Sequence, residues 1–171
     1  MKQTRISTMC LALILGLFLN VQASQEIPYK GTTVLVLLDS TEHDLPDGRT
    51  IYREKTAGFL ITDDQNHPLH LMQKTCYGSL ISADGAQTLE GNGFCEQMDS
   101  NGNVIWEWWE GDQTGGTWGY TGGTGKYKGV RGSGTWKLDT SGSYKGILHD
   151  GKQIVVAEGV IEVQGDEIPP N

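Results

Sequence analysis

The sequence is short of positive charge, and this shortage excludes whole classes of partner. Thirteen lysines and arginines stand against 21 aspartates and glutamates, which gives a formal net charge of −8. The basic residues do not gather in a run anywhere in the chain. Nucleic acids and anionic membrane surfaces both require basic patches. We therefore expect the chain to bind neither a nucleic acid nor, once its leader is removed, a membrane.

Sequence signatures of common catalytic and metal sites are missing as well. The chain contains no GxSxG elbow and no CxxC or HExxH spacing, and its glycine-rich stretch lacks the lysine-hydroxyl ending of a P-loop. Two cysteines without further ligands make a poor metal site. The sequence therefore predicts no metal site and no cofactor.

Helical periodicity is also absent. No window of twelve residues carries apolar side chains at i, i+3, i+4 and i+7, whereas 24 glycines and only five prolines are present. Short β-branched and aromatic runs alternate with turn signals such as Asn101-Gly102. We predict an all-β barrel or sandwich of about eight strands, and closure into a barrel is favoured because it removes the edges. The expected strands cover residues 32–40, 49–62, 70–82, 88–98, 104–110, 132–139, 143–149 and 153–164.

The N-terminus has the pattern of a signal peptide. A positively charged start precedes an apolar run of eleven residues from Met9 to Leu19, and the small residue Ala23 suits cleavage directly after it. The alternative, a membrane anchor, would need an apolar run of about 20 residues. We expect a signal peptide over residues 1–23, a single β-barrel domain over residues 24–171, and a periplasmic or secreted location.

Two cysteines, Cys76 and Cys95, follow the expected cleavage site. In an oxidising compartment such a pair favours a disulfide. If residues 83–86 lie at a hairpin tip and the ladder is centred between Gly85 and Ala86, Cys76 lies directly opposite Cys95, where the two Cβ atoms can be close enough to bridge. A bond that closes a loop of about 20 residues stabilises the fold by roughly 3 kcal/mol. The sequence therefore predicts a Cys76–Cys95 disulfide.

A glycine-rich segment, Thr121–Trp136, has the most distinctive pattern of the chain, TGGTGKYKGVRGSGTW. Its glycines alternate loosely with aromatic, basic and β-branched residues. A phosphate-binding role is the weaker interpretation, because no helix follows to supply an N-terminus. Glycines in a strongly coiled sheet permit tight bends, bulges and close approach of backbones. The segment is therefore interpreted as structural.

The same segment resembles the repeated GGTG-x-[FY]-x-G-[AIV]-x-G element of the allene oxide cyclase-like and dirigent-like barrels, which include exported bacterial members. The resemblance implies a closed eight-stranded antiparallel barrel, calycin-like, with an apolar cavity. It also implies a small hydrophobic molecule as partner, and a homo-oligomer, since members are often oligomeric. In plant relatives the cavity binds reactive lipid or phenolic intermediates and directs cyclisation or coupling without a cofactor. Arg131 stands where the pattern carries a basic residue, which implies a role in the site.

A run of aromatic residues, Trp106-Glu107-Trp108-Trp109, is expected on one strand, where alternate residues share a face. If Ile105, Glu107 and Trp109 point inward, Glu107 is a carboxylate in apolar surroundings that suit general acid–base work. If Trp106 and Trp108 point inward, they form an aromatic ligand wall and Glu107 is solvated. Packing in the core or in an oligomer is the plainer role for the tryptophans. The catalytic candidates are Glu107 and Arg131, and the ligand-binding candidates are Trp106, Trp108, Trp109 and Tyr120.

Two functions from different classes fit these observations. The first is a cofactor-free isomerase or cyclase that acts on an apolar or phenolic substrate in the cavity, and it requires an inward carboxylate or arginine. The second is a lipocalin- or avidin-like binding protein for a small hydrophobic ligand, which needs aromatic walls but no buried ionisable group. A completely filled interior would instead leave a structural protein of the envelope. The sequence alone does not decide whether the chain is an enzyme.

Overall fold

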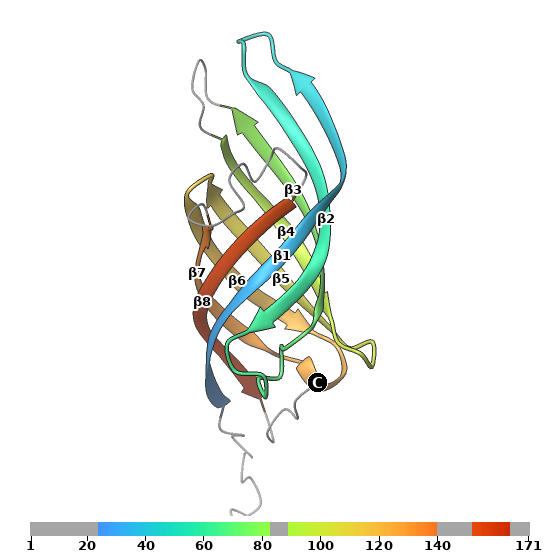
Figure 1. Cartoon of the computed structure of the whole chain (residues 1–171), viewed down its shortest axis with the longest axis vertical. Helices are drawn as coiled ribbons and strands as arrows, with labels where there is room; N and C mark the ends of the chain where they lie inside the picture. Colours follow the sequence, from blue (N-terminus) through green and yellow to red (C-terminus); the bar gives the residue numbers. More distant parts are fainter. Residues whose placement is uncertain (1–23, 83–88, 140–151, 165–171) are drawn as a thin grey trace, which may run out of the picture.

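The computed structural model describes residues 24–82, 89–139 and 152–164, and β-strands make up most of them. Each strand pairs antiparallel with the next one along the chain, and β1 also pairs with β8, so that the sheet closes into a barrel (Figure 1). This confirms the predicted closed eight-stranded antiparallel barrel. The strands are β1 (Ser24–Asp44), β2 (Thr50–Thr62), β3 (Gln73–Ser82), β4 (Leu89–Met98), β5 (Val104–Asp112), β6 (Gly115–Gly123), β7 (Arg131–Leu138) and β8 (Lys152–Gln164).

Two strands differ from the expectation. β1 begins at Ser24, well before the β-branched run, because its first half pairs with β8 from Ser24 opposite Gln164 onward. β6 was not predicted as a strand, since five of its nine residues are glycines, which weaken isolated strands. The strand expected over residues 143–149 lies outside the described residues, as do the expected signal peptide and the turn over residues 83–86.

The predicted disulfide is confirmed. Cys76 lies directly opposite Cys95 in the ladder between β3 and β4, and their sulfurs are bonded across a Cα–Cα distance of 4.0 Å. Both residues are buried inside the barrel and pack against Leu35. A buried disulfide is compatible with export to an oxidising compartment. Among the residues described, no helix is long and apolar enough to cross a membrane.

One end of the barrel is filled by the segment between β2 and β3. Leu69 and Met72 of this segment are fully buried, and the hydroxyl of Tyr127, from the short 3₁₀ helix η1 (Gly125–Tyr127), donates a hydrogen bond to the carbonyl oxygen of Pro68 at 2.8 Å. This packed end is the lower one in Figure 1. Its core consists of Tyr29, Leu60, Leu69, Met72, Ile105, Trp118, Tyr120, Tyr127, Val130, Ala157, Ile161 and Val163.

Glycines let the inward-facing tryptophans lie close to the backbone of neighbouring strands. A Cβ atom on Gly78 would lie 2.7 Å from Cζ2 of Trp109, and a Cβ atom on Gly159 would lie 2.7 Å from Cζ2 of Trp118. Within the glycine-rich segment, a Cβ atom on Gly132 would lie 2.6 Å from the carbonyl oxygen of Val160. The glycines therefore allow side chains and strands to lie close to one another, as the structural interpretation of the glycine-rich segment predicted.

Candidate ligand-binding cavity

Above the packed end the barrel is hollow. The cavity has a volume of about 620 Å³, within the range of about 300–1,000 Å³ that is typical of pockets for drug-sized ligands. Its lining is mostly apolar and aromatic, and the exposed residues Asp112, Gln113 and Thr114 around the β5–β6 turn mark its mouth. The interior is therefore not completely filled, and the reason to expect a purely structural protein falls away.

The structure decides which face of β5 points inward. Ile105 is fully buried, and Glu107 and Trp109 line the cavity, whereas Trp106 on the other face is 43% exposed. Because successive side chains of a strand alternate between faces, Trp108 lies on the outer face with Trp106. The carboxylate of Glu107 thus projects into the barrel, which is the first of the two alternatives that the sequence left open.

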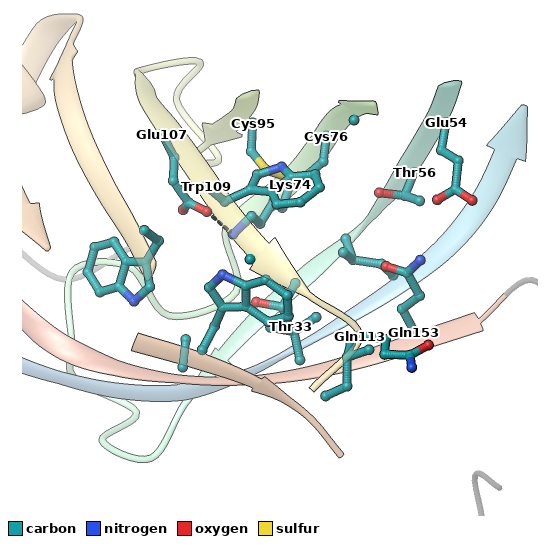
Figure 2. Close-up of a pocket in the computed structure, with 18 of the residues that line it drawn as sticks. Thr33, Glu54, Thr56, Lys74, Cys76, Cys95, Glu107, Trp109, Gln113 and Gln153 are labelled. Atoms are coloured by element: carbon teal, nitrogen blue, oxygen red, sulfur yellow. Dashed lines mark hydrogen bonds and ion pairs between the residues drawn. A yellow bond between two sulfur atoms is a disulfide. The ribbon is translucent and has the colours of Figure 1, made fainter. Parts of the chain in front are cut away.

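Glu107 forms an ion pair with a lysine from β3. Lys74 Nζ lies 2.6 Å from Glu107 Oε1, and the two side chains are only 11% and 6% exposed. The second carboxylate oxygen, Oε2, accepts a hydrogen bond from the side-chain amide of Gln97 on β4. Figure 2 shows Lys74 and Glu107 turned toward each other beside the disulfide. The buried carboxylate is therefore compensated by one full positive charge and one amide donor.

Two tyrosines lie close to this pair. The hydroxyl of Tyr120 lies 3.1 Å from Gln97 Nε2, which links Tyr120 to Glu107 through the amide. Burial, and then the negative charge of Glu107, raise the pKa of Tyr120 well above its ordinary value, and the same two causes raise the pKa of Tyr29. Both hydroxyls stay protonated at neutral pH, so neither serves as a base. The hydroxyl of Tyr120 accepts a hydrogen bond from Gln97 Nε2 and donates one to Gln97 Oε1.

The predicted site residues occupy different parts of the barrel. Glu107 and Trp109 line the cavity, while Tyr120 lies in the buried core beneath it. Trp108 is on the outer face, where its indole covers Gly119, so neither it nor Trp106 forms part of the ligand wall. The expectation of an aromatic wall from these two side chains does not fit their placement.

Arg131 also lies away from the cavity. Its side chain is on the outside of β7, where its guanidinium donates to the carbonyl oxygens of Thr121 and Val130. The glycine pattern thus predicted the fold that contains β7, but the side chain of Arg131 does not lie in the cavity where the resemblance implied a role for it. Lys74 and Gln97, which the sequence analysis did not single out, occupy the position beside Glu107 instead.

Trp109 depends on the absence of a side chain at Gly78. An alanine there would meet the indole of Trp109 at 2.7 Å, while its next non-Trp109 neighbour, the carbonyl oxygen of Asn92, is 3.9 Å away. We expect Gly78→Ala to lower the free energy of unfolding by about 1–3 kcal/mol, because the ring must move into the cavity. Urea denaturation checks this. In a Trp109→Leu background the same substitution should cost much less, and an equal cost in both backgrounds would contradict the contact.

No metal centre is apparent in this part of the molecule. Among the described residues, no group of three histidine, cysteine, aspartate or glutamate side chains is placed to hold a metal ion.

Comparison with known proteins agrees with this architecture. No protein-family model and no curated protein matches the sequence. Among solved structures, the pterocarpan synthase dirigent protein GePTS1 superposes with a TM-score of 0.52 over 84% of this chain and 93% of that chain. The fold is that of a dirigent-like barrel. The sequence identity to GePTS1 is 13%, so the likeness concerns the fold alone. The pterocarpan synthase dirigent protein PsPTS1 is also 13% identical to this chain. Its TM-score is 0.45, and the alignment covers 85% of this chain and 98% of the PsPTS1 chain.

Proposed function

We propose that the barrel binds a small apolar or phenolic molecule in its cavity and acts on it as a cofactor-free isomerase or cyclase. One observation carries the proposal: a buried ion pair, Lys74–Glu107, projects into a cavity that is otherwise mostly apolar. A binding protein for apolar ligands needs no such pair, because taking charges out of water costs free energy. A buried ion pair that costs free energy is expected where its charges act on a bound ligand.

The pair offers two complementary groups to a bound molecule. Each carboxylate oxygen has two lone pairs, so Glu107 can still accept a proton while it is held by Lys74 and Gln97. The ammonium of Lys74 can stabilise negative charge that develops on an oxygen atom of the ligand. An isomerisation or ring closure returns the proton to another atom of the same molecule, so that the reaction balances without an oxidant or reductant.

The second candidate is binding without chemistry, and a specific observation favours it. Both oxygens of Glu107 are already engaged, Oε1 by Lys74 and Oε2 by Gln97. A carboxylate held on both sides is well placed to fix the position of Lys74, and it is less free to approach a ligand. In this case the pair would orient a ligand and transfer no proton.

Replacement of Glu107 distinguishes the two candidates. A panel of phenolics, fatty acids and terpenoids would be screened by quenching of tryptophan fluorescence, and ligands that bind would be incubated and analysed by mass spectrometry for isomeric products. We expect Glu107→Gln to lower turnover by about 100- to 10,000-fold, the usual worth of an acid–base group, with little change in ligand affinity. Glu110→Gln is the matched control, because Glu110 is an exposed carboxylate on the same strand.

Each result of this experiment has a separate meaning. Binding without a product in the unsubstituted protein would favour the second candidate. Full turnover in Glu107→Gln would contradict the role of Glu107. Failure of the whole panel to quench tryptophan fluorescence would contradict both candidates.

A further inference from the structure

The ammonium of Lys74 has more hydrogen-bond donors than partners among the described residues. The ammonium of Lys74 carries three N–H groups. Within the described part of the chain it meets one acceptor, Glu107 Oε1 at 2.6 Å. The side chain is only 11% exposed, so bulk water has little access to the other two donors. A ligand atom that accepts hydrogen bonds would satisfy them.

Three carboxylates line the cavity, those of Glu54, Glu107 and Asp112, and among the described residues only Glu107 lies within ion-pair distance of Lys74. Glu107 uses one oxygen for Lys74 and the other for Gln97. Asp112, at the mouth, accepts from the backbone N–H of Thr114 at 2.7 Å and from its hydroxyl at 2.6 Å. The other two carboxylates therefore do not engage the remaining N–H groups of Lys74.

The charge of the site indicates what kind of acceptor fits. A ligand carboxylate beside Lys74 would place two negative charges, its own and that of Glu107, against one positive charge in a mostly apolar cavity. An excess buried charge is costly, and the net charge of −8 on the chain also repels anions. A neutral carbonyl oxygen accepts the same hydrogen bonds and adds no charge.

We propose that Lys74 forms a subsite for the carbonyl oxygen of an uncharged ligand, such as an aromatic ketone or enone. The inference rests on the proposed binding of a small molecule in the cavity. The apolar part of such a ligand meets Trp109 and Trp136, whose rings lie edge to face with centroids 6.1 Å apart on the cavity wall. The carbonyl bound by an ammonium would be polarised, which suits the proton movement considered above.

Three naphthalene compounds of similar shape test the subsite: 2-acetylnaphthalene as the ketone, 2-ethylnaphthalene as the hydrocarbon and 2-naphthoate as the anion. Their dissociation constants would be measured by titration calorimetry. We expect the ketone to bind about 10- to 100-fold more tightly than the hydrocarbon, the worth of hydrogen bonds to a charged donor, and 2-naphthoate to bind most weakly. The C=O stretching frequency of the ketone should fall on binding.

Variants show which side chains cause the preference for the ketone. Lys74→Met combined with Glu107→Gln removes both charges together and should abolish the preference for the ketone while the hydrocarbon binds as before. Lys55→Met is the matched control, because Lys55 lies over the ring of Tyr77, which is on the outer face.

Equal binding of ketone and hydrocarbon to the unsubstituted protein would overturn the subsite and leave the proposed binding function standing. Tighter binding of 2-naphthoate than of the ketone would overturn the assignment to an uncharged ligand. If none of the three compounds binds while members of the screened panel do, the subsite fails and the proposed binding function stands.

Discussion

Replacing Lys74 by methionine should lower the free energy of unfolding by about 3–5 kcal/mol, because Glu107 would keep a buried charge with no opposite charge beside it. The two side chains are 11% and 6% exposed, so only water inside the cavity could take the place of the ammonium. Gln97 alone would then hold the carboxylate. Urea denaturation at neutral pH, followed by circular dichroism, measures the loss.

Two further variants define the origin of this loss. The double variant Lys74→Met with Glu107→Gln removes both charges and should recover most of the stability, since replacing a complete buried pair is often close to neutral. Lys55→Met removes an exposed cation–π contact with Tyr77 and should cost only about 0.5–1 kcal/mol. If the single Lys74 variant were as stable as the unsubstituted protein, the ion pair would contribute nothing to the fold.

Removal of the disulfide should have a comparable effect. The bond joins residues separated by 19 positions, and Cys76→Ala with Cys95→Ala should lower the free energy of unfolding by about 3 kcal/mol through the greater freedom of the unfolded chain. The substitution also removes sulfur atoms that pack against Leu35 and line the cavity, so ligand affinity should fall as well. Thermal unfolding and calorimetric titration check the two effects.

Chemical reduction provides the control for this variant. The unsubstituted protein in excess dithiothreitol should unfold at nearly the same urea concentration as the double alanine variant, because both lack the crosslink. Equal stability of oxidised protein, reduced protein and variant would contradict the stabilising role of the bond.

The cysteine register and the pairings of β3 with β4 and of β4 with β5 were predictable because local patterns determine them. The Asn101-Gly102 turn predicted one hairpin. The equal distances of Cys76 and Cys95 from the point between Gly85 and Ala86 predicted the other, and both strand pairings are present. Closure of the barrel followed from the resemblance of the glycine-rich segment. The packed end was not predictable, because Leu69 lies between two expected strands and Met72 was expected inside the strand over residues 70–82, whereas β3 begins only at Gln73.

Only some of the cavity residues could be predicted from the sequence. Glu107 lies opposite Cys95 in the β4–β5 ladder, and Lys74 and Gln97 lie two residues from Cys76 and Cys95, so all of them share the face of the disulfide. Had the disulfide been known to point inward, alternation would have found the complete group. A disulfide between neighbouring strands can lie on either face, however, and only the closed structure decides between them.

Arg131 shows the limit of a resemblance. The glycine pattern depends on backbone geometry, because Gly132 and its neighbours allow β7 and β8 to approach closely. Such a pattern predicts where strands pass and does not specify the chemistry of a side chain between its glycines. Arg131 follows the alternation of β7 to the outer surface, opposite Glu162 of β8.

A crystal structure of the protein with 2-acetylnaphthalene tests the central claim most directly. The account predicts one molecule inside the barrel, its ring system against Trp109 and its carbonyl oxygen about 3 Å from Lys74 Nζ. A cavity that holds only water under saturating ligand, or a ligand bound solely on the outer face, would contradict it.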